Sequence, residues 1–331
     1  MNILYTLNDK FVPQVGAGIC SICENNKQIK DINFYIISYG ITINNKKKMQ
    51  KLVKKYERNI EIIELENLNK YFNFNFDTLG WNKVILSRLL MGNILSKNID
   101  KIIYLDGDTI VRGCLGELWN LDMKNKIIGM SIEPTANKKR KEKLGLKEYP
   151  YYNSGVLLVD LKKWRKYNIQ DKIINYYKEQ NGRLFAADQD AINAVLKDQI
   201  FTISPKYYNI FDQYSYNFCC RLMKPLEYSN YIKKDDYISS RKNPIIIHYL
   251  GEERPWRKYN THKYRNDYKK YLNMTPWKET KDEDGWLLYF TCWKIFNFFT
   301  KPFPKLRYNI INSLIPKFMN YRKKKLKNEN K

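Results

Sequence analysis

Long apolar runs are missing from this sequence. No stretch of about 18 consecutive apolar residues occurs, so no transmembrane helix is expected. Only 14 Gly and 11 Pro occur in 331 residues, which excludes collagen-like and linker-like chains. Residues 1–8 lead directly into a strand pattern, without the basic and apolar regions of a secretory signal. We therefore expect a cytoplasmic protein with free thiols.

Cysteine and histidine are scarce, with six and two residues respectively. Cys20 and Cys23 form a C-x-x-C pair, but neither a second such pair nor a His pair stands nearby to complete a zinc site. Both cysteines fall in a helical pattern over residues 12–23, where they lie on one side as small core residues. We expect a core role for them.

Acidic residues are few relative to basic ones. Subtracting 34 Asp and Glu from 59 Lys and Arg gives a net charge of +25. Such a charge predicts a polyanionic partner: nucleic acid, a phosphorylated small molecule or an anionic membrane surface. The 44% of apolar residues excludes a disordered chain, and the length allows one large domain or two ordinary ones.

Short apolar runs alternate with helical patterns in the first hundred residues. This order predicts an α/β fold, with a mostly parallel central sheet and helices on both faces. Ligands bind such sheets at the carboxyl ends of the strands, here near residues 8–11 and 106–108. Strands are predicted at 3–5, 34–38, 60–65, 101–105, 127–130, 156–159 and 245–248, and helices at 12–23, 45–56, 79–95 and 188–196.

A pair of carboxylates, Asp106 and Asp108, follows the predicted strand at 101–105, with Gly107 between them. Two acidic groups this close repel each other unless a cation lies between them, and Mg²⁺ or Mn²⁺ prefers such oxygen ligands. Gly107 allows a ligand to approach the backbone. Two chemistries are open at this point. Asp106 could be the nucleophile of a haloacid-dehalogenase-type phosphatase, or the pair could hold the metal of a nucleotide-sugar transferase.

Three further strings bear on this choice: YNSGV at 152–156, ADQD at 187–190 and HYLGEERPW at 248–256. With the carboxylate pair, and in this order, they resemble the retaining glycosyltransferases of family 8. That family includes bacterial lipopolysaccharide galactosyl- and glucosyltransferases and the glycogenins. The resemblance covers roughly residues 1–260 and implies a nucleotide-binding fold of the GT-A type. The phosphatase alternative leaves the string at 248–256 unexplained.

The resemblance also implies roles for single residues. Asp106, Asp108 and His248 match the family's ligands for Mn²⁺, with Mg²⁺ as an alternative ion. The residues that match nucleotide-sugar contacts are Asn8, Asp9, Phe11, Arg88, Asp106, Gly107, Asn153, Asp188, Gln189, Gly251 and Arg254.

This sequence departs from the family pattern at three of those positions. The family usually has Lys where Arg254 stands, an acidic residue at Asn8 and Tyr at Phe11. Arg254 keeps the charge and offers a planar fork to a phosphate. Asn8 can still bond the edge of uracil, and Phe11 can still stack on it. Binding of a UDP-sugar is therefore still expected.

The implied reaction retains the configuration of the sugar, and the candidate catalytic residues are Asp188, Gln189 and Asp190. An amide is a poor nucleophile, so the resemblance favours attack from the face of departure, with the leaving phosphate taking the acceptor proton. Basic residues of the segment 137–147 would help stabilise that phosphate. This segment is expected to be a mobile loop or a solvated helix face.

Several of these residues have ordinary structural alternatives. Arg88 would otherwise be a surface residue of an amphipathic helix, and Asn153 part of a turn. Asp188 would otherwise be a helix N-cap, while Asp190 would interact with the dipole of the first turn. The resemblance favours the functional role in each case.

The last 56 residues differ in character from the rest. Residues 286–299 hold seven aromatic side chains, and residues 301–331 carry ten Lys or Arg against one Glu. This composition favours an extension at 276–331 that attaches to an anionic membrane, next to a catalytic domain at 1–275. The alternative is a packed helix with a disordered tail. Deleting residues 277–331 is expected to release the protein from anionic liposomes and to spare hydrolysis of the donor.

Taken together, these features predict a metal-dependent transferase that moves galactose or glucose from a UDP-sugar to a glycan or lipid-linked saccharide. The expected setting is lipopolysaccharide or cell-surface polysaccharide synthesis, with the protein attached peripherally to the inner face of the plasma membrane. A basic nucleic-acid-binding protein is the third alternative. The basic residues crowd into the tail and one loop without a nucleic-acid motif, so no nucleic acid partner is expected.

Overall fold

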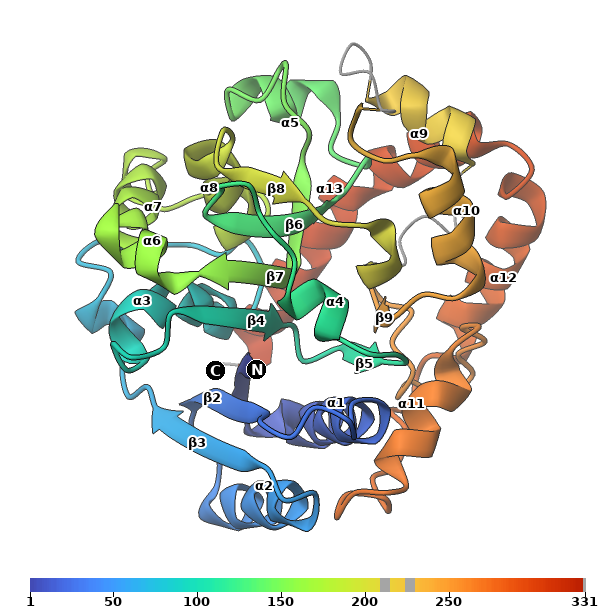
Figure 1. The fold of residues 1–331 in the computed structure, drawn as a ribbon. Helices are drawn as coiled ribbons and strands as arrows, with labels where there is room; N and C mark the ends of the chain where they lie inside the picture. Colours follow the sequence, from blue (N-terminus) through green and yellow to red (C-terminus); the bar gives the residue numbers. More distant parts are fainter. Residues whose placement is uncertain (209–214, 224–229, 330–331) are drawn as a thin grey trace.

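The computed structural model describes residues 1–208, 215–223 and 230–329 (Figure 1). A central sheet of seven strands has the order β3-β2-β1-β4-β7-β6-β8, and β5 pairs with β9 in a small second sheet. The strands are β1 (Asn2–Asn8), β2 (Asn33–Tyr39), β3 (Asn59–Glu64), β4 (Lys101–Leu105), β5 (Thr109–Val111), β6 (Ile128–Ile132), β7 (Tyr152–Asp160), β8 (Ile200–Thr202) and β9 (Ile246–His248).

Helices surround the central sheet (Figure 1). The α-helices are α1 (Val12–Asn25), α2 (Ile43–Lys55), α3 (Met91–Ile94), α4 (Gly116–Trp119), α5 (Lys138–Lys143), α6 (Leu161–Lys166), α7 (Ile169–Glu179), α8 (Ala187–Leu196), α9 (Tyr216–Leu222), α10 (Lys234–Lys242), α11 (Arg265–Leu272), α12 (Leu287–Thr300) and α13 (Pro304–Glu329). The 3₁₀ helices are η1 (Asp9–Phe11), η2 (Leu68–Lys70), η3 (Lys83–Leu90) and η4 (Pro205–Tyr207).

The strand directions bring several chain segments to one edge of the central sheet. β1, β2, β3 and β4 run parallel to one another, and β7 is antiparallel to both β4 and β6. β6 therefore runs in the same direction as β4, and β8 is parallel to β6. As a result, the ends of β1, β4, β6 and β8 and the start of β7 all lie at this edge. The predicted α/β fold with a mostly parallel sheet is confirmed.

Alternating side chains of the strands build two cores on opposite faces of the sheet. In β1, Ile3 and Tyr5 pack in one core with α1, α2 and α11, whereas Leu4 packs in the other with η3, α6, α7 and α8. Successive strand residues point to opposite faces, and the apolar run of β1 is buried on both. Cys20 and Cys23 are free and buried within α1, which confirms their core role.

The segments 79–95 and 137–147 were both considered as helices in the sequence. A single α-helix over 79–95 is wrong, because the chain forms η3 followed by the short α3. Leu79 and Gly80 have φ angles of +52° and +98°, which no right-handed helix contains, and the Asn82 side chain caps η3. The basic segment 137–147 contains α5, so the helical alternative describes its middle better than a loop does.

The segment after residue 275 packs against the rest of the chain. Trp277 lies on α1 so closely that a Cβ on Gly16 would be 2.5 Å from its ring. Its indole N–H donates to Asn45 of α2 at 3.0 Å. In α13, Tyr308 makes an edge contact with Phe218 of α9, their ring centroids 6.0 Å apart. In Figure 1, α12 lies along the right-hand side of the molecule.

Candidate active site

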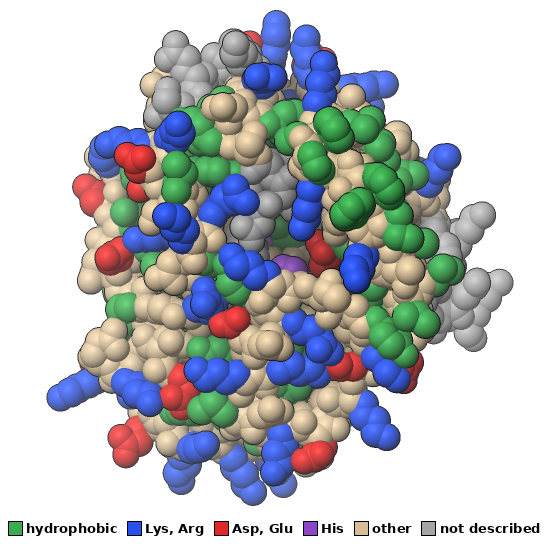
Figure 2. All heavy atoms as spheres, turned by 90° about the vertical axis from the view of Figure 1, so that its right-hand side faces the viewer, with side chains coloured by type: hydrophobic (Ala, Val, Ile, Leu, Met, Phe, Trp, Pro, Cys, Tyr) green, Lys and Arg blue, Asp and Glu red, His purple; other side chains and the backbone are tan. Residues whose placement is uncertain are grey.

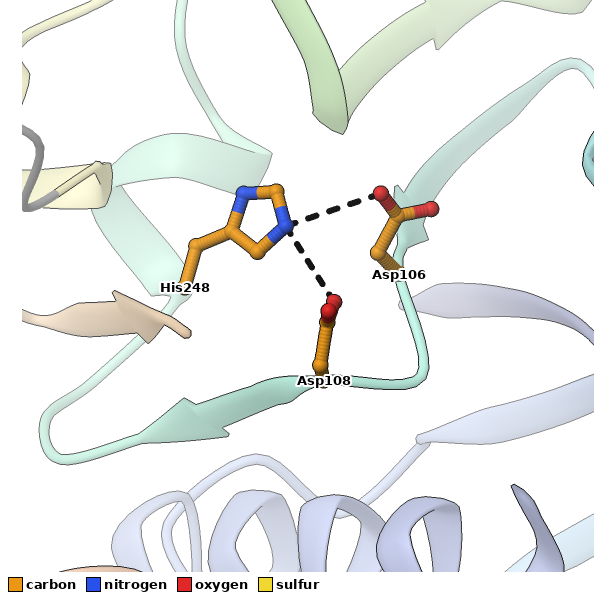
Figure 3. A group of neighbouring side chains, drawn as sticks. All are labelled: Asp106, Asp108 and His248. Atoms are coloured by element: carbon orange, nitrogen blue, oxygen red, sulfur yellow. Dashed lines mark ion pairs between the residues drawn. The ribbon is translucent and has the colours of Figure 1, made fainter. Parts of the chain in front are cut away.

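Asp106 and Asp108 lie in the turn between β4 and β5. β5 pairs antiparallel with β9, with Thr109 opposite His248. This register brings the imidazole beside the two carboxylates, with Nε2 at 3.6 Å from Asp106 Oδ2 and 3.2 Å from Asp108 Oδ1 (Figure 3). The three predicted metal ligands, which are 142 residues apart at the extremes, therefore meet at one point.

The cluster formed by Asp106, Asp108 and His248 fits a divalent cation. Mg²⁺ holds octahedral ligands at about 2.1 Å, so adjacent ligand atoms lie roughly 3 Å apart, close to the distances seen here. Burial disfavours the charged form of His248, but Asp108 and Asp106 outweigh this and raise its pKa. Burial likewise opposes the charge of Asp108, and His248 and Arg254 outweigh it and lower the pKa of that carboxyl. The group thus attracts positive charge strongly.

Gly155 in β7 leaves the space that the cluster occupies. A Cβ on Gly155 would lie 2.2 Å from Cε1 of His248 and 2.9 Å from Oδ2 of Asp106. Real Cβ atoms do not approach other atoms so closely, so any side chain here would displace the imidazole. Gly155 belongs to the YNSGV string, but its role becomes visible only when β7 lies beside β4 and the imidazole reaches over from β9.

Arg88 connects the cluster to α8. Its guanidinium lies 3.0 Å from Asp106 Oδ1 through Nη1 and 3.1 Å from Asp188 Oδ2 through Nε. Nη1 also donates to the carbonyl oxygen of Ser154 at 2.7 Å. The side chain is only 3% exposed, so the alternative of a surface residue is wrong. A buried arginine with two carboxylates fixes both of them in position.

Asp188 is buried at the start of α8. The N-cap residue of α8 is Ala186, so the N-cap alternative for Asp188 is wrong. Burial raises the pKa of Asp188 to about 6, although Arg88 acts in the opposite direction. The charge of this carboxyl, held next to the buried arginine, can interact with a sugar or phosphate group nearby.

The amides of Gln189 and Asn153 are held by a carboxylate that the sequence analysis missed, Glu133. Glu133 Oε2 accepts from Gln189 Nε2 at 3.2 Å and from Asn153 Nδ2 at 3.1 Å. Gln189 Oε1 accepts from the backbone N–H of Ser154 at 3.0 Å. Glu133 directly follows β6, and the rule that identified Asp106, a carboxylate at a strand end, could have found it.

Asp190 is bound by Arg140 and Tyr151, and the hydroxyl of Tyr151 also accepts from Gln189 Nε2 at 3.0 Å. Asp190 Oδ1 accepts from Nη2 of Arg140 at 2.6 Å and from the hydroxyl of Tyr151 at 2.7 Å, and its Oδ2 accepts from the backbone N–H of Ala186 at 3.0 Å. The structure thus places this predicted catalytic residue in a contact between α5 and α8. Arg140, from the basic segment 137–147, is used in the same contact.

The residues predicted to bind the nucleotide lie next to the carboxylates. The guanidinium of Arg254 is 3.5 Å from Asp108 Oδ2 and lies over the ring of Phe11 at 5.5 Å. Phe11 in turn covers Gly107, where a Cβ would be 3.2 Å from the ring. Buried Asn8 Oδ1 and Arg254 Nε make no hydrogen bond within the described residues, as expected of groups that await a ligand.

Two of the predicted contacts stand in a different environment. The Asp9 carboxylate accepts from the backbone N–H of Thr42 at 2.8 Å and from Asn45 at 2.9 Å, so it fixes the start of α2. Gly251 has a φ of +64° with open space beside it, which suits a tight turn after β9. Phe11 and Gly107 therefore lie with Arg254, and Asn8 ends the strand that precedes them. Asp9 instead binds the start of α2.

Tyr208 is another neighbour that the sequence analysis missed. Its ring centroid lies 5.7 Å from that of His248, and its hydroxyl is buried without a hydrogen-bond partner among the described residues. Burial raises the pKa of Tyr208 well above its usual value, and the negative charge of Glu133 raises it further. No motif marks it, because it reaches the site only through the position of η4 after β8.

The surface around this region is strongly basic. Figure 2 shows Lys and Arg side chains around a hollow, with a histidine visible at its floor and hydrophobic side chains gathered along one rim.

Among the described helices, none is both long enough and apolar enough to cross a bilayer.

Comparisons with known proteins identify a family for this chain. A family model described as Glycosyl transferase family 8 matches residues 2–260. The chain is 28% identical over 281 residues to the general stress protein A of Bacillus subtilis, covering 84% of this chain and 94% of that protein. It is 27% identical over 299 residues to a lipopolysaccharide 1,2-glucosyltransferase of Escherichia coli K12, covering 86% and 81%.

Solved structures give the same result for the fold. The galactosyltransferase LgtC, crystallised with donor and acceptor sugar analogs, matches with a TM-score of 0.70 at 22% identity, covering 86% of this chain and 99% of that one. This likeness confirms the predicted GT-A type fold.

Proposed function

Because the chain belongs to glycosyl transferase family 8, we propose that it moves a hexose, galactose or glucose, from a UDP-sugar to a glycan or lipid-linked saccharide. The observation that carries this proposal is the meeting of Asp106, Asp108 and His248 beside Arg254. The relatives named above include a lipopolysaccharide 1,2-glucosyltransferase, which supports a role in lipopolysaccharide or cell-surface polysaccharide synthesis.

In this proposal, Asp106, Asp108 and His248 hold Mn²⁺ or Mg²⁺. When bound, such an ion supplies Lewis-acid stabilisation of negative charge on a diphosphate. Arg254 lies beside the same cluster and can donate to phosphate oxygens from its fork. Phe11 and Asn8 offer a ring face and an amide to the base, and Asp9 keeps their segment in place through α2.

We assign the sugar-binding side of the site to Asn153, Asp188 and Gln189. The amide of Gln189 is fixed at both ends by Ser154 and Glu133, so it presents a defined surface to the sugar and is a poor nucleophile. Retention of configuration then follows from attack on the face of departure. The leaving phosphate takes the proton of the acceptor hydroxyl, and Arg254 stabilises the negative charge that develops on it.

The phosphatase alternative is disfavoured by the contacts of Asp106. Its Oδ1 accepts from the hydroxyl of Tyr104 at 2.8 Å and lies near Arg88, while Oδ2 faces His248. Oδ1 is thus held by two donors, and in this proposal Oδ2 faces the cation, which leaves neither oxygen free to attack phosphorus. The charge needed for nucleic acid binding is present, yet the described fold is that of a glycosyltransferase.

The proposed function is tested with purified protein, Mn²⁺ and a set of UDP-sugars. We expect UDP with Mn²⁺ to raise the melting temperature, because a ligand that binds only the native state stabilises it. We also expect slow hydrolysis of UDP-galactose or UDP-glucose. Asp108→Asn should lose both effects, whereas Asp235→Asn, an exposed acid on α10, should keep them. Release of phosphate from generic monoesters, without any effect of UDP, would contradict the proposal.

We further propose that the protein works while attached peripherally to the inner face of the plasma membrane. Large apolar side chains lie exposed on α12 and the following turn, with Leu288 76% and Phe298 78% exposed. Lys294, Lys301 and Lys305 lie among them, and a basic apolar surface fits an anionic lipid surface. Seven exposed side chains form this surface, which we call the outer face of α12. Five lie in α12, Phe303 lies in the following turn and Leu306 at the start of α13; the five are Leu287, Leu288, Ile295, Phe298 and Phe299.

A liposome sedimentation assay tests the membrane proposal. The wild-type protein should sediment with phosphatidylglycerol-containing vesicles and stay in solution with neutral ones. The double variant Phe298→Ser/Phe299→Ser should sediment much less, while Ile43→Ser, which removes an exposed apolar residue of α2, should sediment as the wild type does. Equal sedimentation of all three proteins would exclude the outer face as the docking surface.

A further inference from the structure

The inner side of α12 contacts the segment that follows β9. This segment, residues 249–257, carries Gly251 and Arg254, and we call it the donor loop. Trp286, the N-cap residue of α12, lies under Arg257 at the end of the donor loop. The guanidinium carbon of Arg257 is 3.5 Å from the centroid of the Trp286 ring, the shortest cation–π distance among the described residues. Desolvated contacts of this kind are among the stronger ones.

Arg257 holds the donor loop closed. Its Nη1 donates to the carbonyl oxygen of Glu252 at 2.8 Å and forms an ion pair with the carboxylate of the same residue. Its Nε lies 3.2 Å from the carboxylate of Glu283, whose backbone pairs with residues 256 and 258. Trp286 therefore covers the arginine on which the shape of the loop depends.

A second contact lies about two helical turns further along α12, at Trp293. The carboxyl of Glu253, in the donor loop, is half-buried, and partial burial raises its pKa, while the nearby Trp293 indole, Arg307 and Lys301 act in the opposite direction. The Trp293 N–H lies beside this carboxyl without forming a hydrogen bond of regular geometry. Fully buried Arg307 of α13 lies over the Trp293 ring at 5.0 Å and donates to Thr300 at 3.0 Å, so α13 supports this contact.

The opposite side of the donor loop forms part of the site. Arg254 reaches Asp108 and Phe11, and its carbonyl oxygen accepts from Asn260 at 2.6 Å. By contrast, the space around Gly251 is open, and a Cβ there would touch nothing within 4 Å. A loop with one open side depends for its position on what packs behind it, and behind Glu252 and Glu253 stands α12.

We propose that Trp286 and Trp293 are positioning residues for the nucleotide-sugar donor, because they hold the donor loop where Arg254 and Gly251 can meet the diphosphate. This inference rests on the proposed function and deepens it. It also changes an expectation drawn from the sequence, that removal of residues 277–331 spares donor hydrolysis. Such a deletion would remove the support of the donor loop together with the outer face of α12.

The experiment compares UDP binding and donor hydrolysis in single variants of the full chain. For Trp286→Ala and Trp293→Ala we expect the Kd of UDP with Mn²⁺, and the KM of the donor, to rise about tenfold, as the loss of one strong cation–π or packing contact implies. The kcat should stay within a factor of about two, because Asp188 and Gln189 are not touched. Binding of Mn²⁺ alone should not change.

Conservative and matched variants complete the design. Trp286→Phe retains a ring under Arg257 and should recover most of the affinity for UDP. Trp119→Ala removes a tryptophan that lies under Lys101 at 5.3 Å in α4, away from the donor loop, and should leave the KM unchanged. Circular dichroism identifies any variant that fails to fold. If one alanine variant fails, the other alanine variant carries the test. If both fail, Trp286→Leu and Trp293→Leu replace them, because each removes the aromatic ring and keeps apolar volume.

The outcomes separate this inference from the proposed function. If the wild-type protein binds UDP with Mn²⁺ and the folded alanine variants bind it equally well, the positioning role is wrong and the proposed function stands. If all variants lose kcat at an unchanged KM, the positioning role is also wrong. If the wild-type protein binds no UDP at all, the proposed function itself fails.

Discussion

The edge of the central sheet and the outer face of α12 depart from the ordinary distribution of residues in opposite ways. At the sheet edge, charged groups such as Arg88 and Asp188 are buried. On α12, large apolar groups such as Leu288 and Phe298 are exposed. Folding alone favours neither arrangement, because buried charge and exposed apolar area both cost free energy. A function is therefore expected in regions that contain buried charge or exposed apolar area.

The two regions also differ in what holds them. Each buried charge at the sheet edge has a partner of opposite sign within 3.6 Å. The inner side of α12 contacts the donor loop, whereas its outer face carries apolar groups that the described residues leave exposed. The charges of the site thus balance one another, whereas no part of the chain that the structure describes covers the outer face of α12. The four predictions below test this contrast.

The largest effect is expected for Asp106→Asn. This change removes a ligand from the cluster and one of the two carboxylates that neutralise Arg88. A loss of several kcal/mol of electrostatic stabilisation corresponds to a rate decrease on the order of 10³-fold. Transfer of sugar from the accepted donor is the measurement. Sedimentation with anionic liposomes should not change, and a simultaneous loss of both properties would show that the two regions are not independent.

Arg88→Lys should have the next largest effect. Lysine keeps the positive charge but cannot reach Asp106, Asp188 and Ser154 at once, because it lacks the planar fork. We expect kcat/KM for the donor to fall on the order of 10²-fold, in line with losses at other electrostatic sites. Full activity of the lysine variant would mean that charge alone suffices and that the geometry of the bridge is unimportant.

Gly155→Ala tests whether the cluster depends on empty space in β7. The added methyl group would displace His248, so the affinity for Mn²⁺ should fall roughly 10- to 100-fold, the range typical of changes next to metal ligands. Calorimetric titration with Mn²⁺ measures it. Gly113→Ala is the control, because its Cβ would make only an ordinary contact of 3.5 Å with Ile245. Equal Mn²⁺ affinity in both variants would argue against His248 as a ligand.

The smallest effect concerns folding. Phe298→Ser/Phe299→Ser should change the free energy of unfolding by no more than about 0.5 kcal/mol per site, because exposed side chains contribute little to the folded state. Denaturation with urea in the absence of lipid measures this. A strong destabilisation would mean that these side chains are covered in solution, and the contrast between the two regions would disappear.

Much of the fold could be predicted from the sequence because its signals are local. The strand over 101–105 was predicted with its observed bounds, and the helix beginning at Val12 followed from its apolar pattern. The exception at 79–95 is instructive. A helical apolar pattern is present there, yet Leu79 and Gly80 adopt left-handed conformations, and the backbone N–H of Leu79 donates to the Asp77 carboxylate at 2.9 Å, so no helix begins at residue 79.

The site divides in the same way. Asp106 and Asp108 are adjacent to a strand end, and His248 ends another strand, so strings of a few residues indicated them. Glu133 was missed although it follows a strand end as Asp106 does, because no neighbouring carboxylate marks it. Tyr208 was missed because it reaches the site only through the position of η4 after β8. Asp190 shows the converse, because it belongs to a functional string and yet points to Arg140.

The sequence by itself determined that one strand ends at Leu105, beside Asp106, and another at His248, and therefore that carboxylates and a histidine would be available at strand ends of an α/β fold. Only the tertiary structure decided that Arg88 is buried between Asp106 and Asp188, and that α12 has an inner and an outer side. The reason is physical. Strand periodicity and strand ends are properties of consecutive residues, whereas burial and charge pairing arise between segments that the chain brings together only on folding.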